Sequence, residues 1–473
     1  MIEFILNNKH IRTNEPPGKS LLDFIRYTMD LPGTKSGCRE GDCGACTVME
    51  GSLIDNELNY KTIVSCLTPL GNVQGKHIVT IEGLNMNHLS PAQQAIVEHG
   101  GTQCGFCTPG FVVSLTNQSL SKEVGNPDKA LAAIDGNICR CTGYKSIERA
   151  AKSLADSFNG EKNSLANLVE QGHLPKYFMG IADRLQQLKT NQKQVGNSAV
   201  ILGGGTDLLV QKADGIIEDE LDFLSGRNEL KGIQIQDNIC KIGAATTAAE
   251  ISNSVELQKY FPQLKSYFKL ISSTPIRNMG TIGGNLANAS PIGDLSIFFL
   301  ALDTEIQLQD KEGTKRNIPL KEFFIDYKKL DLHSDEYIQH IAFRIPEKNE
   351  YFNFEKVSKR QHLDIASVNT AIRIRIKNES IVEASLSAGG VSPIPLQLSK
   401  TTSFLAGKKL NEETILEANK IMQSEISPIS DIRGSDTYKR LLLRQLFFAH
   451  FMKLFPAKIS FGKLFALTNQ QKL

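Results

Sequence analysis

The chain has 473 residues, which is enough for about three domains of ordinary size. Its 53 Lys and Arg residues nearly balance its 51 Asp and Glu residues, and the formal net charge of +2 argues against nucleic acid as a partner. No apolar run approaches the ~20 residues of a membrane span, and the N-terminus lacks the pattern of a signal peptide. We therefore predict a soluble, cytoplasmic protein without a membrane partner.

The nine cysteines are unevenly distributed, because eight of them precede residue 142. Cys38, Cys43 and Cys46 follow the spacing C-x4-C-x2-C, and Cys66 is a distant fourth. This is the plant-type pattern of a [2Fe–2S] cluster, in which one tight, glycine-rich loop points three thiolates at two irons. A zinc site usually has paired C-x-x-C motifs, and disulfides do not suit a reducing cytosol. The spacing thus favours an iron–sulfur cluster.

Local patterns around this loop predict a small mixed sheet with one helix. Residues 2–13 have a hairpin pattern around an Asn-Asn pair, and Ser20 is a candidate N-cap of a helix. Residues 46–64 contain two strand patterns. Within an α+β multidomain chain, we predict a ferredoxin domain of the β-grasp type over residues 1–82.

The next residues, 83–158, contain three predicted helix starts. Three sites place an N-cap residue directly before a proline: Ser90-Pro91, Thr108-Pro109 and Asn126-Pro127. One C-x-x-C and one C-x-C motif lie at the predicted helix junctions, and their cysteines are Cys104, Cys107, Cys139 and Cys141. A structural zinc site is the alternative from local spacing, but the preceding plant-type loop favours a second [2Fe–2S] cluster. We predict a helical cluster domain of the four-helix type over residues 83–158.

The two cysteine groups, with residues 103–110 (QCGFCTPG) and 139–144 (CRCTGY), resemble the two iron–sulfur domains of the xanthine oxidase family of molybdenum hydroxylases. All eight ligand positions of that family are present. The resemblance implies one [2Fe–2S] cluster on each set of four cysteines. It also implies that Gln103 lies against the pterin of a molybdenum cofactor on a neighbouring domain; the alternative is that Gln103 caps a helix.

A polar segment and a glycine run follow. Residues 159–195 are rich in Asn, Lys and Gln, so we predict a connector that is partly ordered at best. A buried-strand pattern at 199–202 then leads into GGGTDLLV at 203–210. Such a turn between a strand and a helix directs several backbone N–H groups at one point, which suits a pyrophosphate. The string is not G-x-G-x-x-G, so a Rossmann fold is not favoured, and an ordinary tight turn is the alternative.

A second element, residues 276–285 (IRNMGTIGGN) followed by 289–294 (ASPIGD), resembles the second flavin-contacting loop of the same family. The resemblance implies an FAD domain of the vanillyl-alcohol-oxidase (PCMH) type over residues 196–348. It also implies an α+β C-terminal domain of the CO dehydrogenase flavoprotein type over residues 349–473. The FAD contacts that it implies are Ile201, Leu202, Gly203, Gly204, Gly205, Thr206, Asp207, Leu208, Thr281, Gly284, Asn285, Asp294 and Lys356.

Three features of the second half remain. Asp364 ends a loop that in the family borders the flavin face used by NAD, and this chain has Gln361 and His362 where the family has an Arg-rich, acidic version. Cys240 lies in a strand pattern without a partner, and we predict a small buried apolar residue. Residues 438–448 predict a basic amphipathic helix, which could lie on a membrane; packing on its own domain is favoured.

The order of ferredoxin, helical cluster and FAD domains resembles the small subunit of bacterial two-subunit xanthine dehydrogenases, and no segment is long enough for the family's molybdenum-binding half. The resemblance implies a molybdenum-containing large subunit as partner, in a heterodimer or heterotetramer. That subunit would hydroxylate xanthine or hypoxanthine to urate, and electrons would pass through the two clusters to FAD and then to NAD.

Other functions stay open from the sequence. One is the small subunit of a related molybdenum hydroxylase that acts on another N-heterocycle or an aldehyde. Another is a stand-alone NADH-dependent iron–sulfur flavoprotein reductase, which co-purification of a molybdopterin-carrying chain would exclude. A third is a non-catalytic protein whose clusters only support folding, and the paired flavin loops argue against it.

Overall fold

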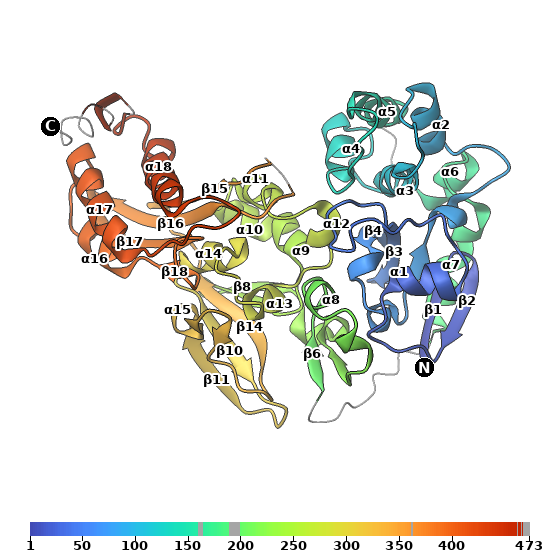
Figure 1. Ribbon diagram of the computed structural model, residues 1–473, viewed down its shortest axis with the longest axis horizontal. Coiled ribbons are helices and arrows are strands. Elements are labelled where there is room, and N and C mark those ends of the chain that lie inside the picture. Colours follow the sequence, from blue (N-terminus) through green and yellow to red (C-terminus); the bar gives the residue numbers. More distant parts are fainter. Residues whose placement is uncertain (159–163, 189–198, 361–362, 461, 465, 467–473) are drawn as a thin grey trace. The chain divides into compact units, whose positions relative to one another are not determined.

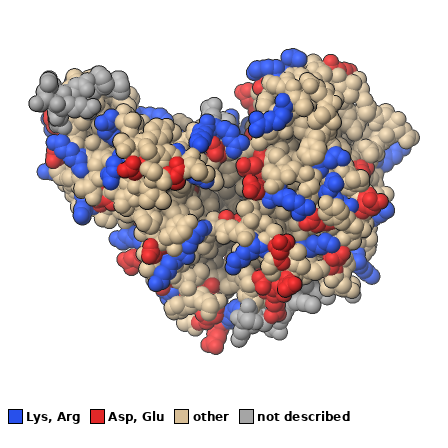
Figure 2. Space-filling model, in the orientation of Figure 1, with Lys and Arg blue, Asp and Glu red and all other residues tan. Residues whose placement is uncertain are grey.

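A computed structural model describes the following residues of the chain: 1–158, 164–188, 199–360, 363–460, 462–464 and 466. The chain divides into two compact units: Met1–Gly226 with Ser273–Gly280, and Arg227–Ser272 with Thr281–Leu473 (Figure 1). No helix of the described ranges is long and apolar enough to cross a membrane. On the face drawn in Figure 2, Lys and Arg side chains lie interspersed with Asp and Glu side chains.

The first domain of the first unit is a five-stranded sheet with the strand order β2-β1-β5-β3-β4. Its strands are β1 (Ile2–Leu6), β2 (Lys9–Thr13), β3 (Thr47–Ile54), β4 (Glu57–Val64) and β5 (His77–Val79). β1 and β5 run parallel, and the other neighbours are antiparallel. Ser20 caps helix α1 (Leu21–Asp23), as predicted, and a π-helical turn extends it over Phe24–Thr28. The cysteine loop connects this helix to β3, so the β-grasp arrangement is confirmed.

Four helices form the next domain: α2 (Pro91–Glu98), α3 (Thr108–Ser119), α4 (Pro127–Ala133) and α5 (Lys145–Asp156). Ser90 and Asn126 accept backbone N–H groups as N-caps, which confirms two of the three predicted starts. The third start is shifted by one residue, because Thr108 is already helical and Cys107 is the N-cap of α3. The motif cysteines therefore flank helix ends, as expected.

The predicted connector is better ordered than its polar composition suggested. Its described part contains α6 (Leu165–Glu170), a 3-10 turn (Lys176–Gly180) and α7 (Ile181–Gln186). Leu168, Phe178 and Ile181 are fully buried in the first unit. These few apolar side chains, rather than the average composition, decide that the segment folds. Residues 159–163 and 189–198 of the predicted connector lie outside the described residues.

The first glycine run belongs to the first unit. It lies between β6 (Val200–Leu202) and α8 (Leu208–Gln211), and β6 pairs in parallel with β7 (Leu221–Phe223). Leu202, Leu209 and Met279 share one apolar core with the ferredoxin sheet. Met279 comes from the short segment around α12 (Thr274–Arg277), which is also part of this unit. Burial against the ferredoxin domain thus fixes the glycine run in place.

The second unit contains two larger sheets. The first has the strand order β11-β10-β14-β9-β8. Its strands are β8 (Ile233–Gln236), β9 (Ile239–Gly243), β10 (Glu305–Gln309), β11 (Lys315–Pro319) and β14 (Tyr337–Arg344). The helices and the small hairpin next to it are α9 (Ala248–Asn253), α10 (Val255–Tyr260), α11 (Leu264–Lys269), α13 (Ile282–Ala287), α14 (Asp294–Leu300), α15 (Leu320–Phe323), β12 (Phe324–Asp326) and β13 (Lys329–Leu330). Cys240 is fully buried on β9 as an apolar residue, as predicted, and burial raises the pKa of its thiol to about 12.

The second sheet has the order β15-β16-β17-β18 and carries the C-terminal helices. The elements are β15 (Glu350–Val357), β16 (Val368–Lys377), β17 (Ser380–Gly389), β18 (Leu396–Gln397), α16 (Ser399–Leu405), α17 (Glu412–Glu425) and α18 (Asp436–Leu454). α18 buries Leu443, Phe447 and Phe451 in this domain's own core. The predicted amphipathic helix therefore packs on its own domain.

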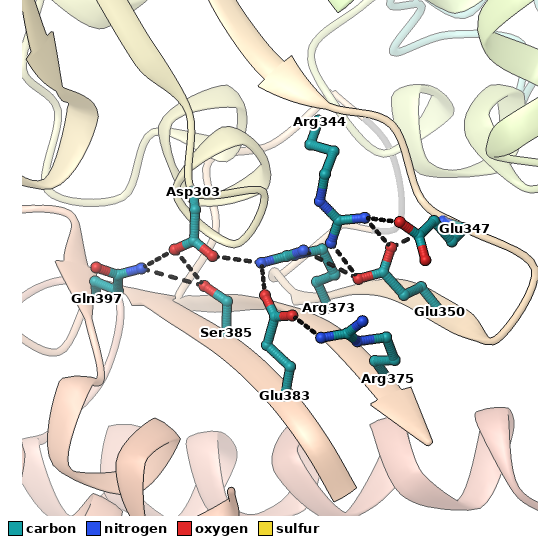
Figure 3. A network of polar contacts seen from close by, with 9 residues as sticks. All are labelled: Asp303, Arg344, Glu347, Glu350, Arg373, Arg375, Glu383, Ser385 and Gln397. Carbon is teal, nitrogen blue, oxygen red and sulfur yellow. Dashed lines mark hydrogen bonds and ion pairs between the residues drawn. The ribbon is translucent and has the colours of Figure 1, made fainter. Parts of the chain in front are cut away.

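A polar network joins the two sheets of the second unit (Figure 3). Its centre is the buried Arg373 on β16, which forms ion pairs with Glu350, Asp303 and Glu383 at 3.1, 2.5 and 2.7 Å. Arg344 at the end of β14 also pairs with Glu350. Because Asp303 follows α14 and Glu350 begins β15, the network ties a helix of the first sheet to the strands of the second.

Candidate cofactor sites

The first cysteine loop is held in a tight curl by local hydrogen bonds to sulfur. The backbone N–H of Cys38 donates to Cys43 Sγ, and that of Glu40 donates to Cys38 Sγ, both at 3.4 Å. Cys46 and Cys66 are buried beneath the loop, whereas Cys38 is exposed. Backbone donors of this kind stabilise the thiolate, which is the form of cysteine that binds metal.

The four thiols form two neighbouring pairs. The Cys38 and Cys43 thiols are neighbours that shift each other's pKa, and so are the Cys46 and Cys66 thiols. The neighbouring Cys43 thiol lowers the pKa of Cys38 to about 5, and the Cys38 thiol raises the pKa of Cys43. Cys38 also acts electrostatically on both members of the other pair. The two pairs therefore lie within one group of four.

The second set of cysteines has the same arrangement. Cys104 and Cys141 lie with their sulfur atoms 3.6 Å apart. Burial and the neighbouring Cys139 thiol raise the pKa of Cys107 to about 12. The hydroxyl of Thr142 donates to Cys139 Sγ at 3.2 Å. Cys104 and Cys141 are exposed, whereas Cys139 is buried. This second group therefore opens to the surface of the unit on one side.

The two cysteine loops touch each other directly. The backbone N–H of Ile138 donates to the carbonyl of Cys43 at 2.9 Å. The buried Asn137 donates to Gly44 O at 3.1 Å and accepts from the hydroxyl of Ser114. Gly44 has a φ of +67°, and a Cβ atom there would lie 2.2 Å from Gly136 O. Only glycine therefore allows this close approach between the loops.

Each group of four has the ligands that a binuclear cluster requires. A [2Fe–2S] cluster requires two ligands on each of two irons. Two neighbouring pairs of thiols, with backbone N–H groups directed at sulfur, meet this requirement.

The first glycine run is oriented by an amide of the ferredoxin domain. Asn72 Nδ2 donates to Gly203 O and Gly204 O at 3.1 and 3.2 Å. Because a trans peptide directs its C=O and N–H to opposite sides, the N–H groups of Gly204 and Gly205 point away from Asn72. A Cβ atom at Gly205 would lie 2.6 Å from Pro69, three residues after Cys66. The run therefore lies directly beside the first cysteine group, with the N–H groups of Gly204 and Gly205 on the side away from Asn72.

The second set of predicted flavin residues lies in the second unit. Thr281 is the buried N-cap of α13 and accepts from the Gly284 N–H at 3.2 Å. Lys356 Nζ forms a buried ion pair with Asp294 Oδ2 at 2.7 Å and donates to Leu270 O. Asp294 and Lys356 were predicted as separate contacts, and the structure brings them together.

The predicted flavin residues of the second unit lie in a region with buried polar atoms that have no partner in the described part of the chain. Within the described residues, the buried side-chain oxygens of Asn285 and Ser296 have no hydrogen-bond partner. Buried polar atoms without a partner are costly, and water or a ligand commonly satisfies them. In the first unit, residues 201–208 have backbone N–H groups of the kind that bind a phosphate. Each unit, taken by itself, therefore has polar groups that suit one part of a dinucleotide cofactor.

Two further predictions concerned Gln103 and the loop that ends at Asp364. Gln103 is not a helix cap, because its Nε2 donates to Cys141 O at 3.2 Å and joins the two cysteine motifs of the second group. Gln361 and His362, at the loop predicted to border the flavin, lie outside the described residues. Asp364 is described, and it accepts from the Arg360 N–H at 2.9 Å.

Four domain families match the chain, each by its own region. A 2Fe-2S iron–sulfur cluster binding domain matches residues 4–70, and a [2Fe-2S] binding domain matches residues 80–152. The FAD binding domain in molybdopterin dehydrogenase matches residues 178–348, and the CO dehydrogenase flavoprotein C-terminal domain matches residues 353–454. Fold and matches together define an iron–sulfur flavoprotein, an oxidoreductase module with two 2Fe–2S domains and one FAD-binding domain.

The chain is similar to several larger enzymes. It is 28% identical to xanthine dehydrogenase 1 of Arabidopsis thaliana over 95% of the chain, and 30% identical to xanthine dehydrogenase of Emericella nidulans over 88%. It is 26% identical to aldehyde oxidase 1 of Bos taurus over 96%. The chain spans only 39%, 36% and 39% of the lengths of these three relatives.

A solved structure is similar as well. A carbon monoxide dehydrogenase chain from Hydrogenophaga pseudoflava matches 54% of this chain and 88% of its own, with 26% identity and a TM-score of 0.51. The protein belongs to the molybdenum hydroxylase family, as its four domains and these relatives show. It carries the 2Fe–2S and FAD-binding domains of the electron-transfer module of this family.

Proposed function

We propose that this chain is the electron-transfer subunit of a xanthine dehydrogenase. Cys38, Cys43, Cys46 and Cys66 hold one [2Fe–2S] cluster, and Cys104, Cys107, Cys139 and Cys141 hold the other. Residues 201–208 with Thr281, Gly284, Asn285, Asp294 and Lys356 hold FAD. When bound, these groups carry electrons from a molybdenum-containing partner subunit to NAD.

One observation carries this proposal, namely an unbroken chain of contacts through the first unit. Ile138, next to Cys139 of the second group, donates directly to the carbonyl of Cys43 in the first group. The turn after Cys66 in turn packs against Gly205 of the candidate phosphate loop. The order of contacts is therefore second cysteine group, first cysteine group, flavin loop. This order supports electron flow from the exposed second group towards FAD.

The chain's own residues have a positioning role in this function. Asn137 and Gly44 hold the two cysteine loops together, and Asn72 aims the glycine run. Gln103 bonds the two motifs of the second group and lies beside its exposed cysteines. The exposed cysteines support a contact of this region with the pterin of the partner, as the family resemblance implies.

A related substrate is the second candidate. The similarity to aldehyde oxidase 1 of Bos taurus, at 26% identity over 96% of the chain, is close to that of the xanthine dehydrogenases. The substrate pocket would belong to the partner subunit, so the residues of this chain support both substrates equally. Assays with xanthine and with an aromatic aldehyde distinguish the two.

The relay is tested with the chain alone and with its partner. The chain alone should oxidise NADH with an artificial dye through FAD but should not oxidise xanthine. Adding the molybdenum subunit should restore electron transfer from xanthine to NAD, and Cys139→Ser should abolish it because the second cluster is lost. Xanthine oxidation by the chain alone, or full xanthine–NAD turnover with Cys139→Ser, would contradict the relay.

The FAD assignment is tested separately at Asp294. Asp294→Asn should lower the FAD content of the purified chain several-fold while the iron content stays unchanged, because all cluster cysteines lie in the other unit. Asp326→Asn is the control, because Asp326 is an exposed acid on β12 of the same unit and should leave flavin occupancy unchanged. If flavin occupancy is full in Asp294→Asn as well, Asp294 does not contact FAD.

A further inference from the structure

Helix α14 begins at Asp294, and both carboxylate oxygens of this residue are occupied by the strands of the C-terminal domain. Oδ2 accepts from Lys356 Nζ on β15 at 2.7 Å, and Oδ1 accepts from Asn369 Nδ2 on β16 at 2.5 Å. Asn369 is fully buried. Its amide also donates to Ile292 O at 3.0 Å. The Asn369 side chain therefore binds both the carboxylate of Asp294 and the backbone of the loop that precedes Asp294.

On the neighbouring strand β17, a glycine makes room for the amide of Asn369. Gly389 on β17 is the register partner of Asn369. A Cβ atom at Gly389 would lie 2.2 Å from Asn369 Oδ1, so any larger residue must displace the amide. The next residue, Gly390, donates its N–H to Pro291 O at 2.9 Å. The loop at 291–294 is thus bound at three points, two by Asn369 of β16 and one by Gly390, the residue after β17.

We propose that Asn369 is a positioning residue of the flavin site, which fixes Asp294 and its loop in the geometry that binds FAD, and that Gly389 provides the room for it. The inference rests on the proposed function, because it takes Asp294 as an FAD contact. Its consequence is that the C-terminal domain, through a side chain that need not touch the cofactor, determines how tightly FAD binds.

The test measures FAD binding to the full chain by quenching of flavin fluorescence, with iron content and melting temperature recorded for each variant. Asn369→Ala should raise the Kd for FAD about 10-fold, equal to about 1.4 kcal/mol. It should also change the visible circular dichroism of the bound flavin, since Asp294 loses one of its two fixed contacts. Gly389→Ala should have a similar effect, because it displaces the same amide.

A matched control is available on the same sheet. Ser387 on β17 is fully buried and donates to Ile297 O of α14 at 2.6 Å, but no contact joins it to Asp294. Ser387→Ala should therefore leave the Kd for FAD within about twofold of the wild type, even where its melting temperature falls. Adding Gly389→Ala to Asn369→Ala should weaken FAD binding little further, because the two changes act on one side chain.

The outcomes separate this inference from the proposed function. If wild-type protein binds no FAD, the proposed function fails. If wild-type protein binds FAD and Asn369→Ala binds it equally well, the inference alone is wrong. Equal losses of FAD affinity in Ser387→Ala and Asn369→Ala would also overturn it, because they would mean a general effect of sheet stability. Should Asn369→Ala not fold, Gly389→Ala decides the question.

Discussion

Cys66→Ser is expected to remove one of two iron–sulfur clusters and to halve the iron content of the purified chain, from about four irons to about two. The reason is that the two groups of four cysteines share no member. Cys66 is paired with Cys46 beneath the first loop, and no other described thiol is placed to replace it. Iron analysis and electron paramagnetic resonance of the reduced protein measure the result.

The ninth cysteine provides the matched control. Cys240 is as buried as Cys66 but lies on β9 of the second unit, away from both groups. Cys240→Ser should keep about four irons per chain and both paramagnetic signals. Zinc in the wild-type protein, or an unchanged iron content in Cys66→Ser, would contradict the assignment of two [2Fe–2S] clusters.

Arg373→Met should destabilise the second unit by about 3–5 kcal/mol, the usual cost of removing one member of a buried charge network. The Arg373 side chain is only 6% exposed, and it is bonded to three carboxylates (Figure 3). Without it, Glu350, with a side-chain exposure of 1%, keeps only Arg344 as a cationic partner in the network. Urea unfolding followed by circular dichroism measures the loss.

Arg375 offers a control two residues along the same strand. Its side chain is 36% exposed and pairs with Glu383 alone, which is 37% exposed. Exposed ion pairs contribute little to the free energy of unfolding, so Arg375→Met should lower it by at most about 1 kcal/mol. Equal losses of stability in the two variants would mean that burial does not set the strength of this network.

The sequence was sufficient for features whose residues are close along the chain. Three of the first four cysteines lie within nine positions, and the caps at Ser90 and Asn126 precede their helices directly. The predicted strands and helices followed from such local patterns. Local composition failed at residues 164–188, where a few buried apolar side chains outweigh a polar average.

The residues that hold the candidate sites together could not be predicted from local sequence patterns. Asn72, Asn137 and Asn369 bond to residues 131, 93 and 75 positions away. An isolated asparagine carries no periodic signal, because its role depends on loops that only the folded chain brings near. The pairing of Lys356 with Asp294, 62 positions apart, was missed for the same reason, although both residues had been identified.

The segment Ser273–Gly280 has a consequence for dissecting the protein. It interrupts the second unit in sequence but belongs to the first, where Arg277 forms a largely buried ion pair with Asp135 at 2.9 Å and Asn278 donates to Thr62 O. A fragment that stops at Gly226 lacks these contacts and leaves a gap in the ferredoxin core at Met279. No single cut of the polypeptide therefore yields either unit whole, and a minimal iron–sulfur fragment must carry residues 273–280 through a designed linker.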